Sequence, residues 1–174
     1  PFGVGLLPAG VVSQYSAFFW LFSGCSRFCV GHGAIQITAD INDEEAVKEK
    51  LGNMHFDTVC EFIGFVPEHI ERDYRLFHDI TNQYIYISSA SAYHKPSRNY
   101  IITEGTTLAN PHWEYSRNKI ACEELLMKLY RENKFPVTIV RPSHTYDENH
   151  IPLGVHGKNG FWQVIERIRN EKPV

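Results

Sequence analysis

The chain alternates between short apolar runs and longer stretches in which apolar residues recur every three or four positions. The apolar runs predict strands at 34–38, 57–65, 84–87 and 136–140. The longer stretches predict helices at 43–51, 67–79, 113–133 and 160–170. Regular alternation of strand and helix favours right-handed crossovers, and therefore an α/β fold built on a parallel sheet.

Local signals help to place the ends of these elements. Asn42 followed by Glu45 forms an Asn variant of the capping box, which predicts that the first helix begins at Asp43. Pro67 suits the first turn of the second helix. The run 57–65 is almost continuously apolar, so we expect a strand buried on both faces of the sheet.

Tyr115 and Lys119 open the third predicted helix and lie one turn apart on the same face. A phenol with a pKa of about 10 is a poor base at neutral pH. An ammonium held ~4 Å away contributes about 4 kcal/mol at an effective dielectric constant of ~20, which lowers such a pKa by roughly three units. The pair is therefore a candidate proton-transfer device.

A second polar feature follows the predicted strand 84–87, which ends in the hydroxyl residues Ser88, Ser89 and Ser91. Such a pattern is expected where a buried parallel strand ends in a crevice. Ser91 lies two residues beyond Ser89 and shares its side if the extended conformation continues.

These motifs together resemble those of the extended short-chain dehydrogenase/reductases, and within them the NAD-dependent epimerase/dehydratase branch. The resemblance covers residues from about 34 to the C-terminus, and implies part of a Rossmann-like, doubly wound parallel sheet. It rests on the run Ser88-Ser89-Ala90-Ser91-Ala92-Tyr93, on Glu104, on Tyr115-x-x-x-Lys119, and on Arg141-Pro142-Ser143-His144-Thr145-Tyr146.

The resemblance implies an NAD(P)-dependent redox step at a carbinol carbon. Tyr115 would take or give the hydroxyl proton, while Lys119 would lower its pKa and bind the nicotinamide ribose. Ser89, four residues before Tyr93, matches the family's catalytic Ser/Thr and would orient the substrate oxygen. Ser88 and Ser91 compete with Ser89 for that role.

The cofactor, NAD or NADP, is likewise implied by the resemblance. In the family an Asp after an early strand contacts the adenine, which matches Asp40 with Ile41; an ordinary turn residue is the alternative for Asp40. Gly64 closes a strand-end segment that runs beside the cofactor, where a residue without Cβ allows close approach. The expected cofactor contacts are Asp40, Ile41, Phe62, Ile63, Gly64, Ser88, Tyr115, Lys119 and Pro142.

The substrate expected from the resemblance is a nucleotide sugar or a similar hydroxyl or keto compound, bound with the help of Ser91 and His144. Dehydratases of the family place an Asp-Glu pair after the catalytic Thr, where this chain has Ala90-Ser91. This favours an epimerase or a simple dehydrogenase/reductase. His144 replaces a more frequent Asn, and packing is an equal alternative for it.

The first 33 residues do not match the family, so we expect two parts: an unmatched apolar segment at 1–33 and a partial NAD(P)-binding domain at 34–174. No Gly-x-x-Gly-x-x-Gly phosphate turn is visible in this segment, which we interpret as truncated, foreign or misread. Most of the family's substrate lobe would follow residue 174. An inactive fragment, or a non-catalytic member that binds cofactor or RNA, is the alternative.

Composition and charge argue against several kinds of partner and site. The net charge of −3 and the absence of a Lys/Arg cluster argue against a nucleic-acid partner. Polar residues interrupt the apolar stretch 11–30, so it falls short of a membrane span. The four cysteines fit a reduced, cytoplasmic setting, and Cys25-x-x-x-Cys29-x-x-His32 lacks a second ligand pair, so no metal is expected. A homodimer is expected only by analogy with the family.

Overall fold

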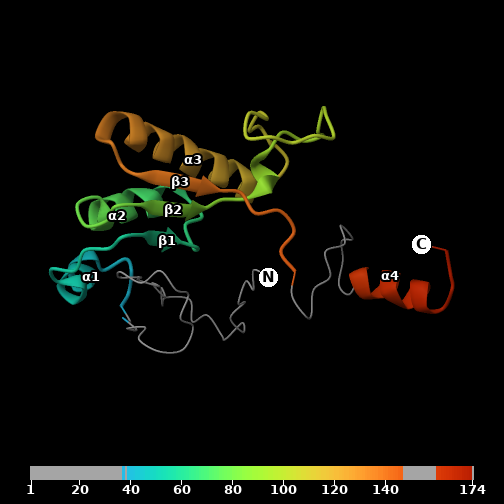
Figure 1. Ribbon diagram of the computed structural model, residues 1–174, viewed down its shortest axis with the longest axis horizontal. Coiled ribbons are helices and arrows are strands. Elements are labelled where there is room, and N and C mark those ends of the chain that lie inside the picture. The colour runs from blue at the N-terminus through green and yellow to red at the C-terminus, as the bar shows by residue number, and fades with distance from the viewer. Residues whose placement is uncertain (1–36, 38, 147–159, 174) are drawn as a thin grey trace. The chain divides into compact units, whose positions relative to one another are not determined.

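The computed structural model describes residues 37, 39–146 and 160–173 (Figure 1). The chain divides into two compact units, and the larger one, which ends at Arg141, holds the sheet. The smaller unit takes in the chain from Pro142 onward, including the last helix. The predicted strand 34–38 lies outside the described residues apart from Ile37, and so does the whole apolar segment 1–33.

The order of elements in the larger unit follows the prediction from α1 to β3. Its helices and strands are α1 (Glu44–Leu51), β1 (Val59–Glu61), α2 (Pro67–Phe77), β2 (Tyr84–Ile87), the short 3₁₀ helix η1 (Ala90–Ala92), α3 (Glu114–Asn133) and β3 (Val137–Val140). The smaller unit contributes α4 (Gly160–Arg169). The long stretch between η1 and α3 is a loop.

The strands form a parallel three-stranded sheet in the order β1-β2-β3. Val59, Tyr84 and Val137 stand side by side across the sheet, which sets the register. Helix α2 packs against both α1 and α3, so the three helices form one layer. The predicted α/β, Rossmann-like parallel sheet is confirmed, with the successive strands joined through helices.

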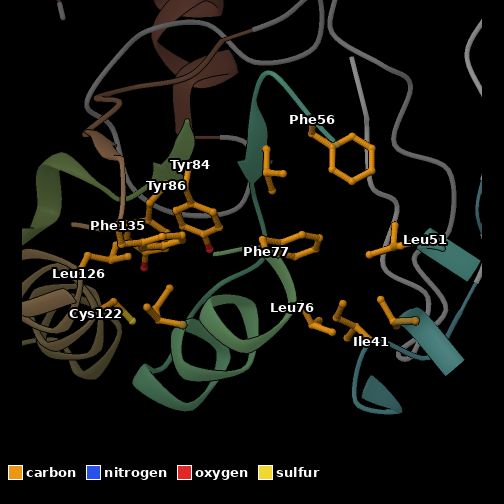
Figure 2. Packing of buried hydrophobic residues seen from close by; sticks show 13 residues of the cluster. Ile41, Leu51, Phe56, Leu76, Phe77, Tyr84, Tyr86, Cys122, Leu126 and Phe135 are labelled. Carbon is orange, nitrogen blue, oxygen red and sulfur yellow. The ribbon is translucent and has the colours of Figure 1, made fainter. Parts of the chain in front are cut away.

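The core lies between this helical layer and the sheet (Figure 2). Tyr84 and Tyr86 point from β2 into it and are fully buried. The Tyr84 ring lies 5.0 Å from that of Phe135, centroid to centroid. Phe77 from α2 and Leu126 from α3 complete the centre of the cluster.

The other face of the sheet is more open, and this corrects one expectation. Strand β1 ends at Glu61, earlier than predicted, and the side chains beyond it are not buried: Phe62 is 57% and Ile63 41% exposed. Within β2, Ile85 and Ile87 on this face are only half-buried. An apolar run was therefore insufficient evidence for burial on both faces, because the described helices α1, α2 and α3 form a single layer.

The start of α1 also differs from the prediction by one residue. The carboxylate of Asp43, not Asn42, caps the helix by accepting the N–H of Ala46 at 3.1 Å. Asn42 instead donates its own N–H to the carboxylate of Asp40 at 3.0 Å. This Asx turn brings the chain into the helix at Glu44. Helix α2 begins at Pro67 as predicted.

Candidate active site

The first two turns of α3 carry the predicted proton-transfer pair. Lys119 is 1% exposed, and its ammonium donates to the carbonyl oxygens of Gly64 at 2.7 Å and Ile87 at 2.8 Å. Ile87 is the last residue of β2, and Gly64 lies shortly after β1. The ammonium is thus held between the carboxyl ends of two neighbouring parallel strands, where α/β proteins place their ligands.

Three aromatic rings surround the rest of this ammonium. Its nitrogen lies 4.7 Å from the ring centroid of Tyr86, 5.0 Å from that of Phe65 and 5.7 Å from that of Tyr115. Ring faces attract cations at such distances. Burial disfavours the charged amine, so the pKa of Lys119 is lowered from its ordinary value.

Tyr115 is half-buried and has two aromatic neighbours of its own. Its ring centroid lies 4.7 Å from that of Trp113 and 6.3 Å from that of Phe65. Trp113 is the N-cap residue that directly precedes α3, and it is 55% exposed. The Tyr115 phenol and the Lys119 ammonium are on the same side of α3, in agreement with their spacing.

The three candidate serines have different environments. The buried Ser88 hydroxyl donates to the carboxylate of Glu123. The Ser91 hydroxyl accepts from the hydroxyl of Ser116 at 3.0 Å. The Ser89 hydroxyl accepts the N–H of Ser91 at 3.1 Å, and this contact leaves the Ser89 proton free for another oxygen.

The segment after β2 is not extended, so Ser91 does not follow Ser89 by strand alternation. Ser89 is the N-cap of η1, and the chain turns there. The turn is bound to α3 because Ser116, the residue after Tyr115, donates to Ser91. Asn110 adds a hydrogen bond of 2.7 Å to the Ser91 carbonyl oxygen. These contacts bring the Ser89 segment against the turn of α3 that carries Tyr115.

The predicted adenine contacts have structural roles in the described residues. Asp40 is exposed and its carboxylate holds the Asx turn before α1. Ile41 is 6% exposed and belongs to the hydrophobic core. The observed contact of Asp40 therefore agrees with the alternative that it is an ordinary turn residue. The cofactor role of Asp40 and Ile41 stays a prediction.

The strand-end segment beyond β1 combines exposed and buried positions. The exposed side chains of Phe62 and Ile63 are free to cover an apolar part of a cofactor. Gly64 is buried, and a Cβ on it would lie 3.1 Å from Glu61 Cγ and 3.1 Å from Tyr86 Cε2. A side chain at this position would therefore force Glu61 and Tyr86 to shift by a few tenths of an ångström. The cofactor roles of Phe62, Ile63 and Gly64 stay predictions.

Pro142 and His144 belong to the smaller unit. Pro142 is half-buried and His144 is exposed. Their predicted roles toward cofactor and substrate stay predictions.

Sequence reasoning missed two groups of buried charges. The first lies between β1 and α2, where Asp73 accepts hydrogen bonds from Arg72 at 2.8 Å and from the Tyr84 hydroxyl at 2.7 Å. Beside it, burial and the negative charge of Asp73 raise the pKa of Glu61 to about 8. The available signal was alternation: Glu61 follows Val59 by two residues and shares its inward face.

The second missed group is the ion pair of Glu123 with Arg141. Glu123 is one helical turn beyond Lys119, so Tyr115, Lys119 and Glu123 occupy nearly the same side of α3. That spacing was visible in the sequence.

Two further searches of the described residues gave negative results. No group of three or more His, Cys, Asp or Glu side chains there could hold a metal ion, and Cys25, Cys29 and His32 lie outside that part of the chain. No helix among the residues with described placement has the length and apolar character needed to span a bilayer.

Similar folds occur in solved structures, two of which are described as epimerases. A putative epimerase from Burkholderia cenocepacia J2315 matches with a TM-score of 0.54 at 18% identity, covering 79% of this chain and 46% of its own. UDP-glucuronic acid 4-epimerase from Bacillus cereus, in complex with UDP-glucuronic acid and NAD, matches with a TM-score of 0.51 at 17% identity, covering 78% and 45%. RMD from Pseudomonas aeruginosa, complexed with NADPH, matches with a TM-score of 0.51 at 18% identity, covering 84% and 53%.

At these identities the solved structures show the fold, and this chain spans about half of their length. No curated protein matches the chain. The sequence model of the NAD dependent epimerase/dehydratase family matches residues 25–174, which extends the expected start at residue 34 toward the N-terminus. The chain therefore belongs to the NAD-dependent epimerase/dehydratase family.

Proposed function

We propose that the intact protein is an NAD(P)-dependent epimerase or dehydrogenase/reductase in which Tyr115 transfers the proton. The observation that carries the proposal is the buried ammonium of Lys119, which lies under the Tyr115 ring and between two strand ends. The dinucleotide, when bound, supplies the hydride chemistry. Because the chain spans about half of the solved relatives, the activity is proposed for the intact protein.

Lys119 would favour the ionised phenol of Tyr115. Two hydrogen bonds to main-chain carbonyls fix its ammonium, so little reorganisation is needed when negative charge develops on the phenol. Lys119 is 1% exposed and lies against the rings of Phe65 and Tyr86, so its ammonium is shielded from water, which strengthens the attraction between the two groups. Tyr115 would then accept the hydroxyl proton of the substrate as hydride leaves the carbon, and return it in the reverse step.

Ser89 is our choice for the hydroxyl that orients the substrate oxygen. The Ser88 hydroxyl donates its proton to Glu123, whereas the Ser89 and Ser91 hydroxyls both act as acceptors in their described contacts. Each of these two can therefore donate a proton to a substrate oxygen. The match of Ser89 to the family's catalytic Ser/Thr position favours Ser89 over Ser91.

The proposed substrate is a nucleotide sugar or a similar hydroxyl or keto compound. A solved relative holds UDP-glucuronic acid with NAD, and another holds NADPH. Ala90 and Ser91 stand where dehydratases have an acid pair, which supports epimerase or reductase chemistry. We retain Ser91 and His144 as proposed substrate contacts, and Asp40, Ser88 and Pro142 as proposed cofactor contacts.

Replacement of Tyr115 by Phe tests the proposal. We expect kcat to fall by about 10²- to 10⁴-fold with little change in NADH affinity, because the ring remains and the transferable proton is lost. Tyr130→Phe, on the exposed part of the same helix, is the control and should keep its turnover. Wild-type turnover in Tyr115→Phe would show that Tyr115 does not transfer the proton.

A cofactor-binding member without catalysis is the second candidate. It is favoured by the hydrogen bonds from Lys119 to the carbonyl oxygens of Gly64 and Ile87, because a purely structural role of Lys119 would explain them. Fluorescence titration with NADH, together with turnover assays on UDP-sugars, separates the two. Binding without any turnover favours this candidate.

A further inference from the structure

The buried carboxylate of Glu123 is held by Arg141 from the neighbouring strand end. Glu123 is 2% exposed, and Arg141 Nε lies 3.0 Å from each of its carboxylate oxygens. Arg141 Nη2 makes a third hydrogen bond, of 2.6 Å, to Oε2. This two-point geometry fixes the orientation of both side chains, because a planar guanidinium matches a carboxylate in few ways.

The remaining end of the Arg141 guanidinium reaches Tyr93. Arg141 Nη1 donates to the Tyr93 hydroxyl at 3.1 Å, and the guanidinium carbon lies 5.1 Å from the ring centroid. Tyr93 is 8% exposed and directly follows η1, and its N–H donates to the carbonyl oxygen of Ala90. The arginine therefore fixes the far end of the short helix that Ser89 begins.

The near end of the same segment is fixed by the carboxylate. Ser88 is 2% exposed, its hydroxyl donates to Glu123, and its N–H donates to the Val140 carbonyl oxygen at 2.7 Å. Ser89 thus lies between two residues, Ser88 and Tyr93, that are bound to the two partners of one ion pair.

The ion pair also relates this segment to the helix that carries the proposed base. Glu123 is on α3, two turns beyond Tyr115 on nearly the same side. Arg141 follows directly after β3, and Ser88 directly after β2. A helix and two strand ends are therefore joined at one buried point next to the Ser89 segment.

Resting on the proposed function, we propose that Glu123 and Arg141 are positioning residues that hold Ser89 in its working place relative to Tyr115. Neither side chain touches a reacting atom in this scheme. They act by fixing Ser88 and Tyr93, the residues on either side of the Ser89 turn. Displacement of a reacting group by about 1 Å costs on the order of 100-fold in rate, so such a device is kinetically significant.

A double-mutant cycle in the intact protein tests the proposal. Glu123→Gln keeps the shape and an acceptor for Ser88, and removes the charge that binds Arg141. We expect kcat to fall by about 10- to 100-fold with the KM for NADH changed less. In the Ser89→Ala background the same replacement should change kcat by less than about 3-fold, because the group that it positions is already absent. Independent, multiplicative effects of the two replacements would overturn the proposal.

Asp73→Asn is the matched control for loss of a buried ion pair. Asp73 is fully buried and bound to Arg72, and it makes no described contact with the Ser89 segment. Its replacement should lower the unfolding midpoint by a similar amount while kcat per folded molecule stays within about 3-fold. An equal loss of kcat in Asp73→Asn and Glu123→Gln would show that the Glu123–Arg141 ion pair has only a structural role, and would overturn the proposal.

Tyr93→Phe covers the case in which Glu123→Gln fails to fold. It removes one hydroxyl and keeps the ring, so a folded protein is expected, with kcat lowered about 10-fold in the wild-type background and little changed in the Ser89→Ala background. No loss of kcat in Tyr93→Phe would count against the proposal. Tyr115→Phe distinguishes failure of the proposed function from failure of the positioning role. Full turnover in Tyr115→Phe would contradict the proposed function. Loss of turnover in Tyr115→Phe, together with independent effects of Glu123→Gln and Ser89→Ala, would contradict the positioning role alone.

Discussion

The ammonium of Lys119 donates to the carbonyl oxygen of Gly64 at 2.7 Å, across 55 residues of sequence. The same carbonyl accepts the Tyr86 hydroxyl at 2.9 Å. A side chain from α3 and a side chain from β2 thus meet at one oxygen just beyond β1. This shared acceptor links the helix that carries the proposed base to both strand ends, so site geometry and local stability depend on the same contacts.

Replacement of Lys119 by Met should destabilise the fold as well as abolish turnover. Met fills similar space, and the cost of burying an ammonium is relieved. The carbonyl of Ile87 loses its described side-chain donor, however, and an unsatisfied buried acceptor costs about 1–3 kcal/mol. We expect a net loss of about 1–2 kcal/mol in urea unfolding. Lys128→Met, at an exposed position of α3, is the control and should change stability by less than about 0.5 kcal/mol.

Replacement of Gly64 by Ala tests the close packing beyond β1. The added Cβ would lie 3.1 Å from Glu61 Cγ and from Tyr86 Cε2, closer than ordinary van der Waals contact. Overpacking of this kind costs about 1–3 kcal/mol, measured as a lower urea midpoint. Gly105→Ala is the matched control, since its Cβ would meet only Thr103 Oγ1 at 3.9 Å. Equal stability of the two variants would contradict the packing argument.

The pattern of apolar residues was sufficient for the order of helices and strands from α1 to β3 and for the parallel sheet, while the predicted strand 34–38 lies outside the described residues apart from Ile37. Strand β2 has the predicted bounds, and α2 begins at Pro67 because proline lacks the N–H that a first turn leaves unused. The apolar pattern did not predict where β1 ends. Phe62 and Ile63 are apolar but exposed. A run of apolar residues does not show which face of a sheet the helices cover.

The site was predictable where spacing alone determines it and not where tertiary partners do. Tyr115 and Lys119 share a side of α3 as expected from their separation. The partners of Glu123 could not be inferred, because Ser88 is 35 residues and Arg141 18 residues away. A buried carboxylate can be recognised as half of an ion pair only when the position of its cation in the fold is known.

Glu61 should make stability fall as pH rises. Burial and the charge of Asp73 raise its pKa to about 8 in the folded protein, against an ordinary value of 4.5. Between these values the folded state holds a proton that the unfolded state has lost. The stabilisation from this proton is therefore complete below about pH 4.5 and is lost as pH rises through 8, with a slope approaching about 1.4 kcal/mol per pH unit.

Glu61→Gln isolates this contribution. The amide keeps an acceptor for the N–H of Ile63 and a donor for Asp73, and it does not titrate. We expect the variant to be more stable than the wild type at pH 8 and its urea midpoint to be flatter between pH 5 and 8. Glu124→Gln, at an exposed position of α3, should leave the wild-type slope intact. Parallel pH curves for Glu61→Gln and the wild type would show that Glu61 is not the titrating group.

Trp113 should affect turnover without contributing much to stability. Trp113 is 55% exposed, and its ring lies 4.7 Å from the Tyr115 ring, centroid to centroid, so it limits the directions that the phenol can take. Trp113→Ala should lower kcat about 10-fold, since a reacting group that is less well oriented reacts more slowly. The urea midpoint should change little, because the ring buries only part of its surface. Trp162→Ala, at a 47% exposed tryptophan on α4, is the control and should retain full turnover. A kcat for Trp113→Ala within 2-fold of that control would mean that the indole does not orient Tyr115.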